Sequence, residues 1–320
     1  MWDHFLSAEQ IDRKRLCLLF DKVQTMRIHQ PYLQGRVVAC LFYEPSTRTA
    51  RSFETAVKRT GGNVLMVSDL ESTSVAKGES FADTIRTFNQ YADAIVIRHP
   101  RQGAALEAAN VSTVPVVNAG DGANEHPTQA LLDAYTIAEH HERLDGLRIT
   151  VVGDLKYGRT VHSLSLLLSK FNVEFKYVRP ETLKMPSGYP EGETHTHLTP
   201  EVLAETDVLY MTRIQRERFA LRGDPHPEIL VKGCHLTPEL VKHLPEESCI
   251  LHPFPRVEEL DLAIDEDPRA LYFKQMANGV PMRAALINTL IHHGQTRSLV
   301  GHGSKWSTED PWGIKGTDSF

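Results

Sequence analysis

The chain has 320 residues, of which 41% are hydrophobic and 24% are charged, and its formal net charge is −6. This composition is typical of an ordinary soluble protein, and the length exceeds one usual core, so we expect two domains. The negative net charge argues against a general nucleic-acid or membrane surface. A bound phosphate would therefore need a local basic pocket.

The chain shows no sign of a membrane span or a secretion signal. No apolar run reaches the ~18 residues that a membrane span needs, and Met1-Trp-Asp-His lacks the basic flank and apolar stretch of a signal peptide. We therefore expect a cytoplasmic protein. The four cysteines lie far apart without a CxxC pair, which predicts reduced, structural thiols. They are Cys17, Cys40, Cys234 and Cys249.

Strand-like apolar runs alternate with helical segments in both halves of the chain. The expected strands are 37–43, 64–67, 94–97, 114–117, 148–152, 174–178, 208–211 and 249–252. This alternation predicts an α/β fold of two domains, each with a mostly parallel sheet flanked by helices. We expect the helix 127–140 to join the domains, and a capping box from Ser7 to Gln10 to open the first helix.

The most informative motif is Glu44-Pro-Ser-Thr-Arg-Thr-Ala-Arg-Ser-Phe-Glu54. An apolar run precedes it and apolar residues at helical spacing follow, so Ser46 to Thr49 fall at a helix N-terminus. Unpaired amides and the helix dipole favour a phosphate there, and Arg48 can add a charge-assisted contact. The alternative is that Ser46 is an ordinary N-cap and Arg48 a solvated side chain.

Two further segments of the first half carry candidate site residues. Asn124-Glu-His126-Pro-Thr-Gln129 places an imidazole and an amide beside a proline that suits the first turn of a helix. Arg98 ends an apolar strand, where the ligands of α/β sheets usually gather. Taken alone, His126 is more often a surface or packed histidine, and Arg98 more often forms a structural salt bridge.

The second half contributes three loops that each follow a strand. The first, from Val151 to His162, includes a glycine loop but no GxGxxG pattern, so we expect no nicotinamide cofactor. In the second, Arg213 and Gln215 suit a short dicarboxylate, although such a loop is usually solvated surface. The third, Leu251-His-Pro-Phe-Pro-Arg256, offers backbone carbonyls between two prolines, and a cis bond can precede Pro255.

Other classes of site have little support in the sequence. His195-Thr-His197 and the pair at 292–293 lack the carboxylate or cysteine neighbours of a metal site, so we expect solvent-facing histidines and no metal. No serine lies in a G-x-S-x-G context, which argues against a hydrolytic triad. The loop Ser72-Thr-Ser74-Val-Ala-Lys77-Gly-Glu79 on its own is typical of a mobile surface segment.

Taken together, these motifs resemble, in the same order, those of the aspartate and ornithine carbamoyltransferases over roughly residues 5–295. The resemblance implies a carbamoyl phosphate-binding domain over 1–133, completed by a returning C-terminal helix at 281–297. It implies an acceptor-binding domain over 134–280 and requires no cofactor. The tail 298–320 lies beyond the resemblance, and disorder is the default there, although Trp306 and Trp312 favour docking on this chain or a partner.

The resemblance also assigns roles to individual residues. The expected carbamoyl phosphate-binding residues are Ser46, Thr47, Arg48, Thr49, Arg98, His126, Gln129, Pro253 and Phe254. Within this set, those expected to be catalytic are Arg48, Thr49, Arg98 and His126. The expected acceptor-binding residues are Lys77, Arg159, Arg213 and Gln215. Phe254 departs from the leucine that is common in the family.

The acceptor that the resemblance favours is L-aspartate. Arg159 would hold its α-carboxylate and Arg213 its β-carboxylate, and the product would be N-carbamoyl-L-aspartate, with phosphate, in de novo pyrimidine (UMP) synthesis. The ornithine-specific enzymes are the nearest alternative. Their Asp-x-x-x-Ser-Met-Gly and His-Cys-Leu-Pro patterns do not occur in this chain.

The resemblance further implies a homotrimer with shared active sites, in which Ser74 and Lys77 come from the adjacent subunit. Glu44 would pair with Arg159 and Arg218 as a clasp on domain closure. A regulatory chain or a dihydroorotase are open as partners. A carbamoyltransferase-like scaffold without activity is a further alternative, and the presence of all the expected site residues argues against it.

Overall fold

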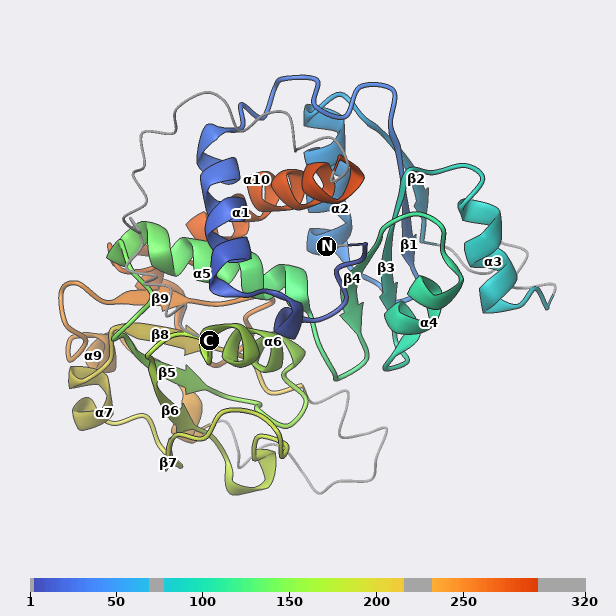
Figure 1. The fold of residues 1–320 in the computed structure, drawn as a ribbon. Helices are drawn as coiled ribbons and strands as arrows, with labels where there is room; N and C mark the ends of the chain where they lie inside the picture. Colours follow the sequence, from blue (N-terminus) through green and yellow to red (C-terminus); the bar gives the residue numbers. More distant parts are fainter. Residues whose placement is uncertain (1–2, 69–77, 216–231, 293–320) are drawn as a thin grey trace, which may run out of the picture. The chain divides into compact units, whose positions relative to one another are not determined.

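The computed structural model describes residues 3–68, 78–215 and 232–292. Within them the chain divides into two compact units, of which unit 1 comprises residues 3–131 and 278–292 and unit 2 comprises 132–277. Each unit contains its own parallel sheet (Figure 1). Two helices, α5 (Pro127–His141) and α10 (Tyr272–Ile291), contribute residues to both units.

The sheet of unit 1 has four parallel strands in the order β2-β1-β3-β4. The strands are β1 (Val37–Phe42), β2 (Asn63–Val67), β3 (Ala94–His99) and β4 (Val116–Asp121). Val38 of the central strand β1 pairs with Val64 on one side and Ala94 on the other. The apolar run of β1 is almost wholly buried, as expected for a parallel strand covered on both faces.

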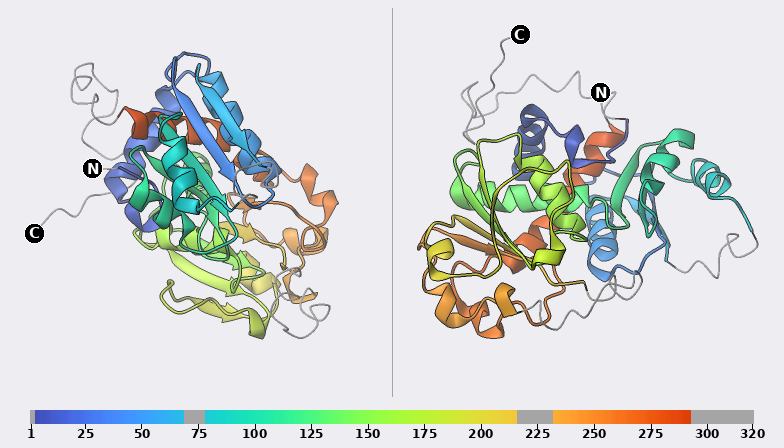
Figure 2. Two further views of the ribbon diagram at one scale, coloured as in Figure 1. Left: turned by 90° about the vertical axis from the view of Figure 1, so that its right-hand side faces the viewer. Right: turned by 90° about the horizontal axis from the view of Figure 1, so that it is seen from below.

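Helices cover both faces of this sheet. Helix α2 (Thr47–Arg59) lies on one face, and α3 (Phe81–Phe88) and α4 (Ala104–Val111) lie on the other (Figures 1 and 2). The buried alanines of α4 let its backbone approach β3 and β4 closely. The predicted strands 94–97 and 114–117 correspond to β3 and β4, but both strands extend further toward their carboxyl ends, so Arg98 lies within β3.

The last part of α10 completes unit 1. Lys22 of α1 (Arg13–Thr25) donates to Thr289 Oγ1 at 3.0 Å, and Arg283 donates to Ser52 Oγ of α2 at 2.8 Å. The guanidinium of Arg283 also lies 5.1 Å from the centre of the Phe53 ring. The prediction of a C-terminal helix that returns to the first domain is therefore confirmed, although the helix begins at Tyr272, earlier than expected.

The start of the chain differs in one respect from the expectation. The capping box between Ser7 and Gln10 is present, but it opens only the short 3-10 helix η1 (Ala8–Gln10). The first α-helix begins at Arg13, where Asp12 accepts a hydrogen bond from the Arg15 N–H as a separate N-cap. The sequence motif was identified correctly, and the length of the helix that it opens was wrong.

The sheet of unit 2 has five parallel strands in the order β7-β6-β5-β8-β9. The strands are β5 (Arg148–Val152), β6 (Glu174–Val178), β7 (Glu193–His195), β8 (Val208–Met211) and β9 (Cys249–Leu251). Helices α7 (Pro200–Ala204) and α9 (Pro238–Val241) pack over one face, and α6 (Arg159–Leu168) follows β5. The edge strand β7 was not predicted, because its three polar residues lack an apolar pattern. His195 is accordingly half-buried in β7 rather than fully solvent-facing.

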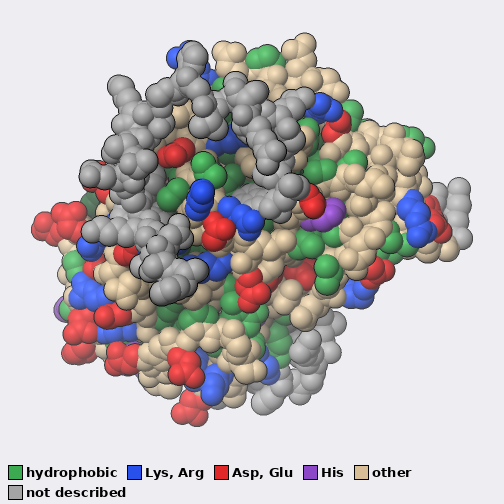
Figure 3. Space-filling model, viewed as in Figure 1, with side chains coloured by type: hydrophobic (Ala, Val, Ile, Leu, Met, Phe, Trp, Pro, Cys, Tyr) green, Lys and Arg blue, Asp and Glu red, His purple; other side chains and the backbone are tan. Residues whose placement is uncertain are grey.

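The charged surface and the cysteine side chains are as expected for a chain with balanced charges and no CxxC pair. Basic and acidic side chains are interspersed over the described residues of the face seen in Figure 3. None of the helices in the described ranges has the length and hydropathy to cross a membrane.

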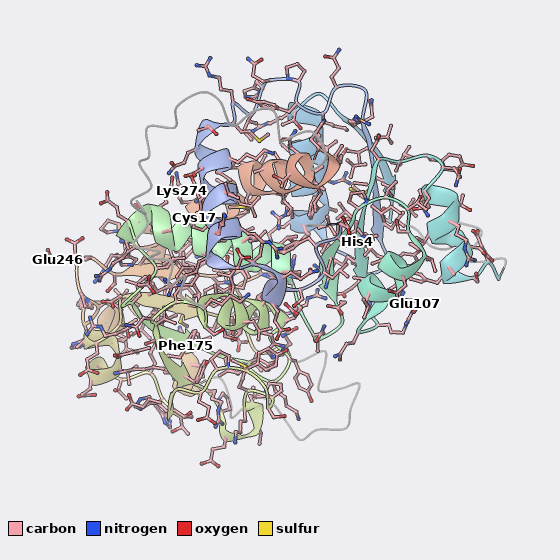
Figure 4. The ribbon with its side chains drawn as sticks, viewed as in Figure 1. His4, Cys17, Glu107, Phe175, Glu246 and Lys274 are labelled. Atoms are coloured by element: carbon pink, nitrogen blue, oxygen red, sulfur yellow. The ribbon has the colours of Figure 1, made fainter. Side chains whose placement is uncertain are left out.

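Cys17, labelled in Figure 4, is partly buried, the other three cysteines are fully buried, and all four are free thiols. Burial raises the pKa of Cys40 and of Cys234 to about 12, so both thiols are held in their protonated form.

Candidate active site

In unit 1, the predicted site residues converge at one edge of the sheet. Strands β1, β3 and β4 are neighbours and parallel, so their carboxyl ends meet at this edge. The segment after β1 carries the phosphate motif, Arg98 is the residue before the last of β3, and the segment after β4 carries His126.

The phosphate motif occupies the first turn of α2. Ser46 is the N-cap residue with extended backbone angles, but its side chain makes no capping hydrogen bond to the helix. Thr47 and Arg48 are exposed, and Thr49 is buried. The first turn contains no acidic residue and includes Arg48. An arginine at the positive end of the helix dipole does not stabilise the helix, so its position there indicates a function for the site.

Thr49 and His126 form the contact that joins the two motifs. Thr49 Oγ1 lies 3.3 Å from His126 Nε2, and both residues are buried. On the other side of the ring, Thr128 Oγ1 lies 3.4 Å from Nδ1. Gln129 follows one helical turn after His126 and is half-buried, so its amide lies on the same face of α5.

The loop that delivers His126 is held by a buried carboxylate, which the sequence analysis missed. Asp121, the last residue of β4, accepts hydrogen bonds from Asn118 Nδ2 at 3.0 Å and from the Glu125 N–H at 3.2 Å. Its other oxygen accepts the Gly103 N–H at 2.9 Å. These bonds fix the backbone immediately before His126. A polar residue that ends an apolar strand is the signal that could have identified it.

Arg98 contacts a carboxylate of the phosphate-motif segment. Its Nη2 donates to Glu44 Oε1 at 3.0 Å, and both side chains are largely buried. The neighbouring Tyr43 N–H donates to the Arg98 carbonyl at 2.8 Å, so the ends of β1 and β3 are also joined through the backbone. Glu44 therefore orients Arg98 within unit 1.

In unit 2, a second buried carboxylate joins two of the predicted loops. Asp154 follows β5 and is fully buried, and it accepts the Tyr157 N–H at 2.9 Å and the Gln215 N–H at 3.2 Å. Burial raises the pKa of Asp154, and the hydrogen bonds from backbone amides oppose that shift. The loop before Arg159 and the loop after β8 are thus connected through one side chain. No pattern in the sequence had indicated a role for Asp154.

Gly153 allows this close approach of the two loops. Its φ is +120°, and a Cβ atom at this position would lie 2.1 Å from the Thr212 carbonyl oxygen. Only glycine fits there without displacing the backbone after β8.

The predicted dicarboxylate-binding residues lie around this junction. Arg159 begins α6, is 7% exposed, and has no acidic neighbour in the first turn of the helix. Gln215 Nε2 donates to the Tyr157 carbonyl at 2.8 Å, so this side chain supports the loop that carries Arg159. Arg213, half-buried, follows β8 two residues before Gln215.

The segment after β9 carries Pro253 and Phe254. The Phe254–Pro255 bond is cis, as predicted. The Phe254 ring packs against the core of unit 2, with its centre 5.7 Å from Tyr272 and 5.5 Å from Phe273. The aromatic ring in place of the family's leucine is thus accommodated by packing on α10.

Three predicted residues, Ser74, Lys77 and Arg218, lie outside the described residues. Within residues 3–68, 78–215 and 232–292, no group of three or more His, Cys, Asp or Glu side chains is arranged to hold a metal ion.

Comparison with known proteins places this arrangement in a family. The carbamoyl-P binding domain model of the aspartate/ornithine carbamoyltransferases matches residues 3–139, and their Asp/Orn binding domain model matches residues 145–290. The aspartate carbamoyltransferase catalytic subunit of Thermococcus onnurineus is 51% identical over 81% of this chain and 85% of its own length. The chain belongs to the aspartate/ornithine carbamoyltransferase family.

Solved structures of this family agree with that assignment. The catalytic subunit of Methanocaldococcus jannaschii aspartate transcarbamoylase is 43% identical, with a TM-score of 0.83 over 92% of this chain and 99% of its own. Aspartate transcarbamoylase from Trypanosoma cruzi, crystallised with carbamoyl phosphate and aspartate, is 38% identical, with a TM-score of 0.81 over 90% and 96% of the two chains. The carbamoyltransferase fold predicted from the sequence is confirmed.

Proposed function

We propose that this carbamoyltransferase transfers the carbamoyl group of carbamoyl phosphate to the amine of L-aspartate. The products are N-carbamoyl-L-aspartate and phosphate, a step of de novo pyrimidine synthesis. One observation carries the proposal. Two helices that each follow a strand have an arginine in their first turn: Arg48 in α2, after β1, and Arg159 in α6, after β5.

The two helix starts suit two anions. Each first turn presents backbone N–H groups, an arginine and no acidic residue. The N–H groups and the dipole attract an anion, and the arginine adds a charge-assisted hydrogen bond worth ~1.5–3 kcal/mol. Carbamoyl phosphate and a dicarboxylic amino acid are two such anions. The Trypanosoma cruzi relative crystallised with carbamoyl phosphate and aspartate supports this pairing of substrates.

The residues of unit 1 would bind carbamoyl phosphate. Ser46, Thr47 and the α2 amides would hold its phosphate with Arg48. Thr49, Arg98 and His126 would donate to its carbonyl oxygen, while the Gln129 amide and the Pro253 and Phe254 carbonyls of unit 2 would orient the amine end. The 3.3 Å contact between Thr49 and His126 supports a shared role for these two side chains.

The reaction needs no covalent intermediate with the protein. The aspartate nitrogen attacks the carbamoyl carbon, and negative charge develops on the carbonyl oxygen as a tetrahedral intermediate forms. The bond from carbon to the phosphate oxygen then breaks, and the leaving phosphate takes the proton from the attacking amine. The protein's contribution is to position the substrates and to stabilise the oxyanion through Thr49, Arg98 and His126.

The acceptor side favours aspartate over ornithine. Arg159 and Arg213 are cations that match two carboxylates, whereas the side chain of ornithine ends in an ammonium group. The Asp154 carboxylate already accepts two backbone N–H groups of the loops and is fully buried. It therefore holds the loops together rather than binding an ammonium group.

The proposal includes a homotrimer in which Ser74 and Lys77 complete the site of the adjacent subunit. Light scattering on the full chain would give the mass of the assembly. At carbamoyl phosphate concentrations well below the KM of Arg48→Ala, mixing Arg48→Ala chains with Lys77→Ala chains under conditions of subunit exchange should raise the activity above that of either variant alone. Activity that does not rise after verified exchange would contradict shared sites.

The direct test measures phosphate release from carbamoyl phosphate with L-aspartate and with L-ornithine in parallel. We expect release with aspartate only. Arg48→Ala should raise the KM for carbamoyl phosphate about 10- to 100-fold. The matched control is Arg51→Ala, because Arg51 lies on the same helix but is exposed and pairs with Glu54 at 2.6 Å.

Release with ornithine alone would overturn the acceptor assignment. Release with neither amino acid would overturn the proposed activity of this chain. An Arg51→Ala variant as impaired as Arg48→Ala would show that the loss reflects damage to α2 rather than to phosphate binding.

A further inference from the structure

His252, the first residue after β9, is 1% exposed and is hydrogen-bonded to different parts of unit 2. Its N–H donates to Gln275 Oε1 at 2.8 Å. Its ring Nδ1 lies 2.8 Å from the Phe254 N, and its ring Nε2 lies 2.7 Å from Glu259 Oε1.

The hydrogen bonds of the ring determine its protonation. The Phe254 N–H can only donate, so Nδ1 must present its lone pair. Nε2 then carries the hydrogen and donates it to the Glu259 carboxylate. The neutral tautomer with hydrogen on Nε2 is the one that satisfies both neighbours.

Both sides of the ring are held in place. Glu259 is buried, and besides the imidazole it accepts the N–H groups of Val257 and Glu258, which gives the carboxylate a fixed orientation. On the backbone side, Gln275 Nε2 donates to Asp133 Oδ1 at 2.6 Å, so the Gln275 amide cannot turn away from His252. The imidazole therefore cannot rotate without breaking several buried hydrogen bonds.

The position of the imidazole sets the direction of a neighbouring carbonyl. The Phe254 N–H and the Pro253 C=O belong to the same peptide group, which is trans and planar, so the two bonds point in opposite directions. A hydrogen bond from the Phe254 N–H to Nδ1 therefore directs the Pro253 carbonyl away from the imidazole.

We propose that His252, held by Glu259, is a positioning residue that aims the Pro253 carbonyl at the amine group of carbamoyl phosphate. This inference rests on the proposed function, which places that carbonyl among the groups that orient the carbamoyl amine. His252 itself touches no reacting atom in this proposal.

Two substitutions separate the functions of the two ring nitrogens. The amide of asparagine can replace the Nδ1 acceptor, and the longer glutamine can replace the Nε2 donor. His252→Asn and His252→Gln are compared in a Glu259→Gln background, so that neither variant leaves an unpaired buried carboxylate. We expect His252→Asn to keep kcat within about threefold of the background and His252→Gln to lower it about 10- to 100-fold.

Three further measurements exclude a purely structural effect. Affinity for inorganic phosphate should stay within about twofold in both variants, since the phosphate motif lies in unit 1. Hydrogen exchange at the Phe254 amide should be slow in the Asn variant and fast in the Gln variant. Thr150→Val, which removes the buried 2.7 Å contact with Thr206 in the same unit, should lower the melting temperature without lowering kcat.

Equal kcat values in the Asn and Gln variants would overturn the inference. A kcat that falls in step with the melting temperature in every variant, including Thr150→Val, would overturn it too. Amide exchange reports on the His252 contact whether or not the chain transfers a carbamoyl group. A wild-type chain without transferase activity but with the expected exchange pattern would therefore count against the proposed function and not against the role of His252 in fixing the peptide.

Discussion

Thr49 Oγ1 and His126 Nε2 lie 3.3 Å apart, although 77 residues separate them in the chain. Thr49 comes from the first turn of α2 and His126 from the residue before α5. The contact places a hydroxyl and an imidazole side by side near a helix start that suits an anion. Two hydrogen-bond donors that meet in this way can act on one oxygen atom as it gains negative charge.

His126→Ala should lower kcat about 10²- to 10³-fold, because one donor to the developing oxyanion is lost. Steady-state kinetics with saturating carbamoyl phosphate and aspartate would measure the change. His140→Ala is the control, since His140 lies on the same helix but is exposed and contacts the Glu247 carbonyl. A similar loss in both variants would argue for a general effect on α5.

Glu44→Gln should lower kcat about three- to tenfold, because a neutral amide orients the Arg98 guanidinium less firmly than a carboxylate does. Arg98→Ala should lower it further. Glu107→Gln is the control. It removes the ion pair between Glu107 and Arg101, which is solvent-exposed in the same unit, and should leave kcat unchanged. An unaltered kcat in Glu44→Gln would show that the orientation of Arg98 does not depend on this charge.

Asp154→Asn should raise the KM for aspartate about 10- to 100-fold and leave the affinity for phosphate unchanged. Asparagine has one carbonyl oxygen, whereas both Asp154 oxygens accept backbone N–H groups, from Tyr157 and Gln215. Calorimetric titration with phosphate and kinetics with aspartate would separate the two effects. Asp261→Asn is the control. Asp261 accepts a single backbone N–H, that of Ala263, so this change should alter neither the KM for aspartate nor the affinity for phosphate.

The free energy of unfolding should rise with pH through the titration of Lys22. Burial lowers the pKa of Lys22 to about 8 in the folded chain, against about 10.4 in an unfolded one. Between these values the unfolded chain binds more protons, so rising pH favours the folded state. Below pH 8 the cost of burying the charged amine is fully present.

Lys22→Met should remove this dependence. Urea unfolding from pH 7 to pH 10 should show the wild type gaining stability relative to the variant, by at most about 3 kcal/mol. Lys14→Met, on the exposed side of the same helix, is the control. Parallel stability curves for wild type and Lys22→Met would contradict the buried position of the charge.

Local patterns predicted those parts of the fold that depend on local chemistry. Strands β5, β6 and β8 were predicted with their observed limits, because each is a short run of strand-forming residues between turns. The edge strand β7 was missed because its pairing with β6 is independent of any apolar pattern of its own. Motif resemblance is the basis of the roles proposed for Arg48, His126 and Arg159, which single residues could not have suggested.

Two residues that support the site, Asp154 and His252, could not be predicted from the sequence for a physical reason. Asp154 matters because two loops, about 60 residues apart in the chain, meet at its carboxylate. His252 matters because a glutamate seven residues later and a glutamine from α10 close around it. In each case the signal is a contact that exists only after the sheet has formed.

The discontinuity of unit 1 has a consequence for the order of folding during synthesis. Domains generally fold as units as the chain emerges, with the N-terminal one first. Here unit 1 includes the contacts of Arg283 with Ser52 and of Lys22 with Thr289, and Arg283 and Thr289 are made after residues 132–277 of unit 2. Among the described residues, unit 2 comprises 132–277 and is therefore synthesised before the last part of α10. On the ribosome, unit 2 should therefore be able to fold before unit 1, because unit 1 is complete only after the last part of α10 has been made.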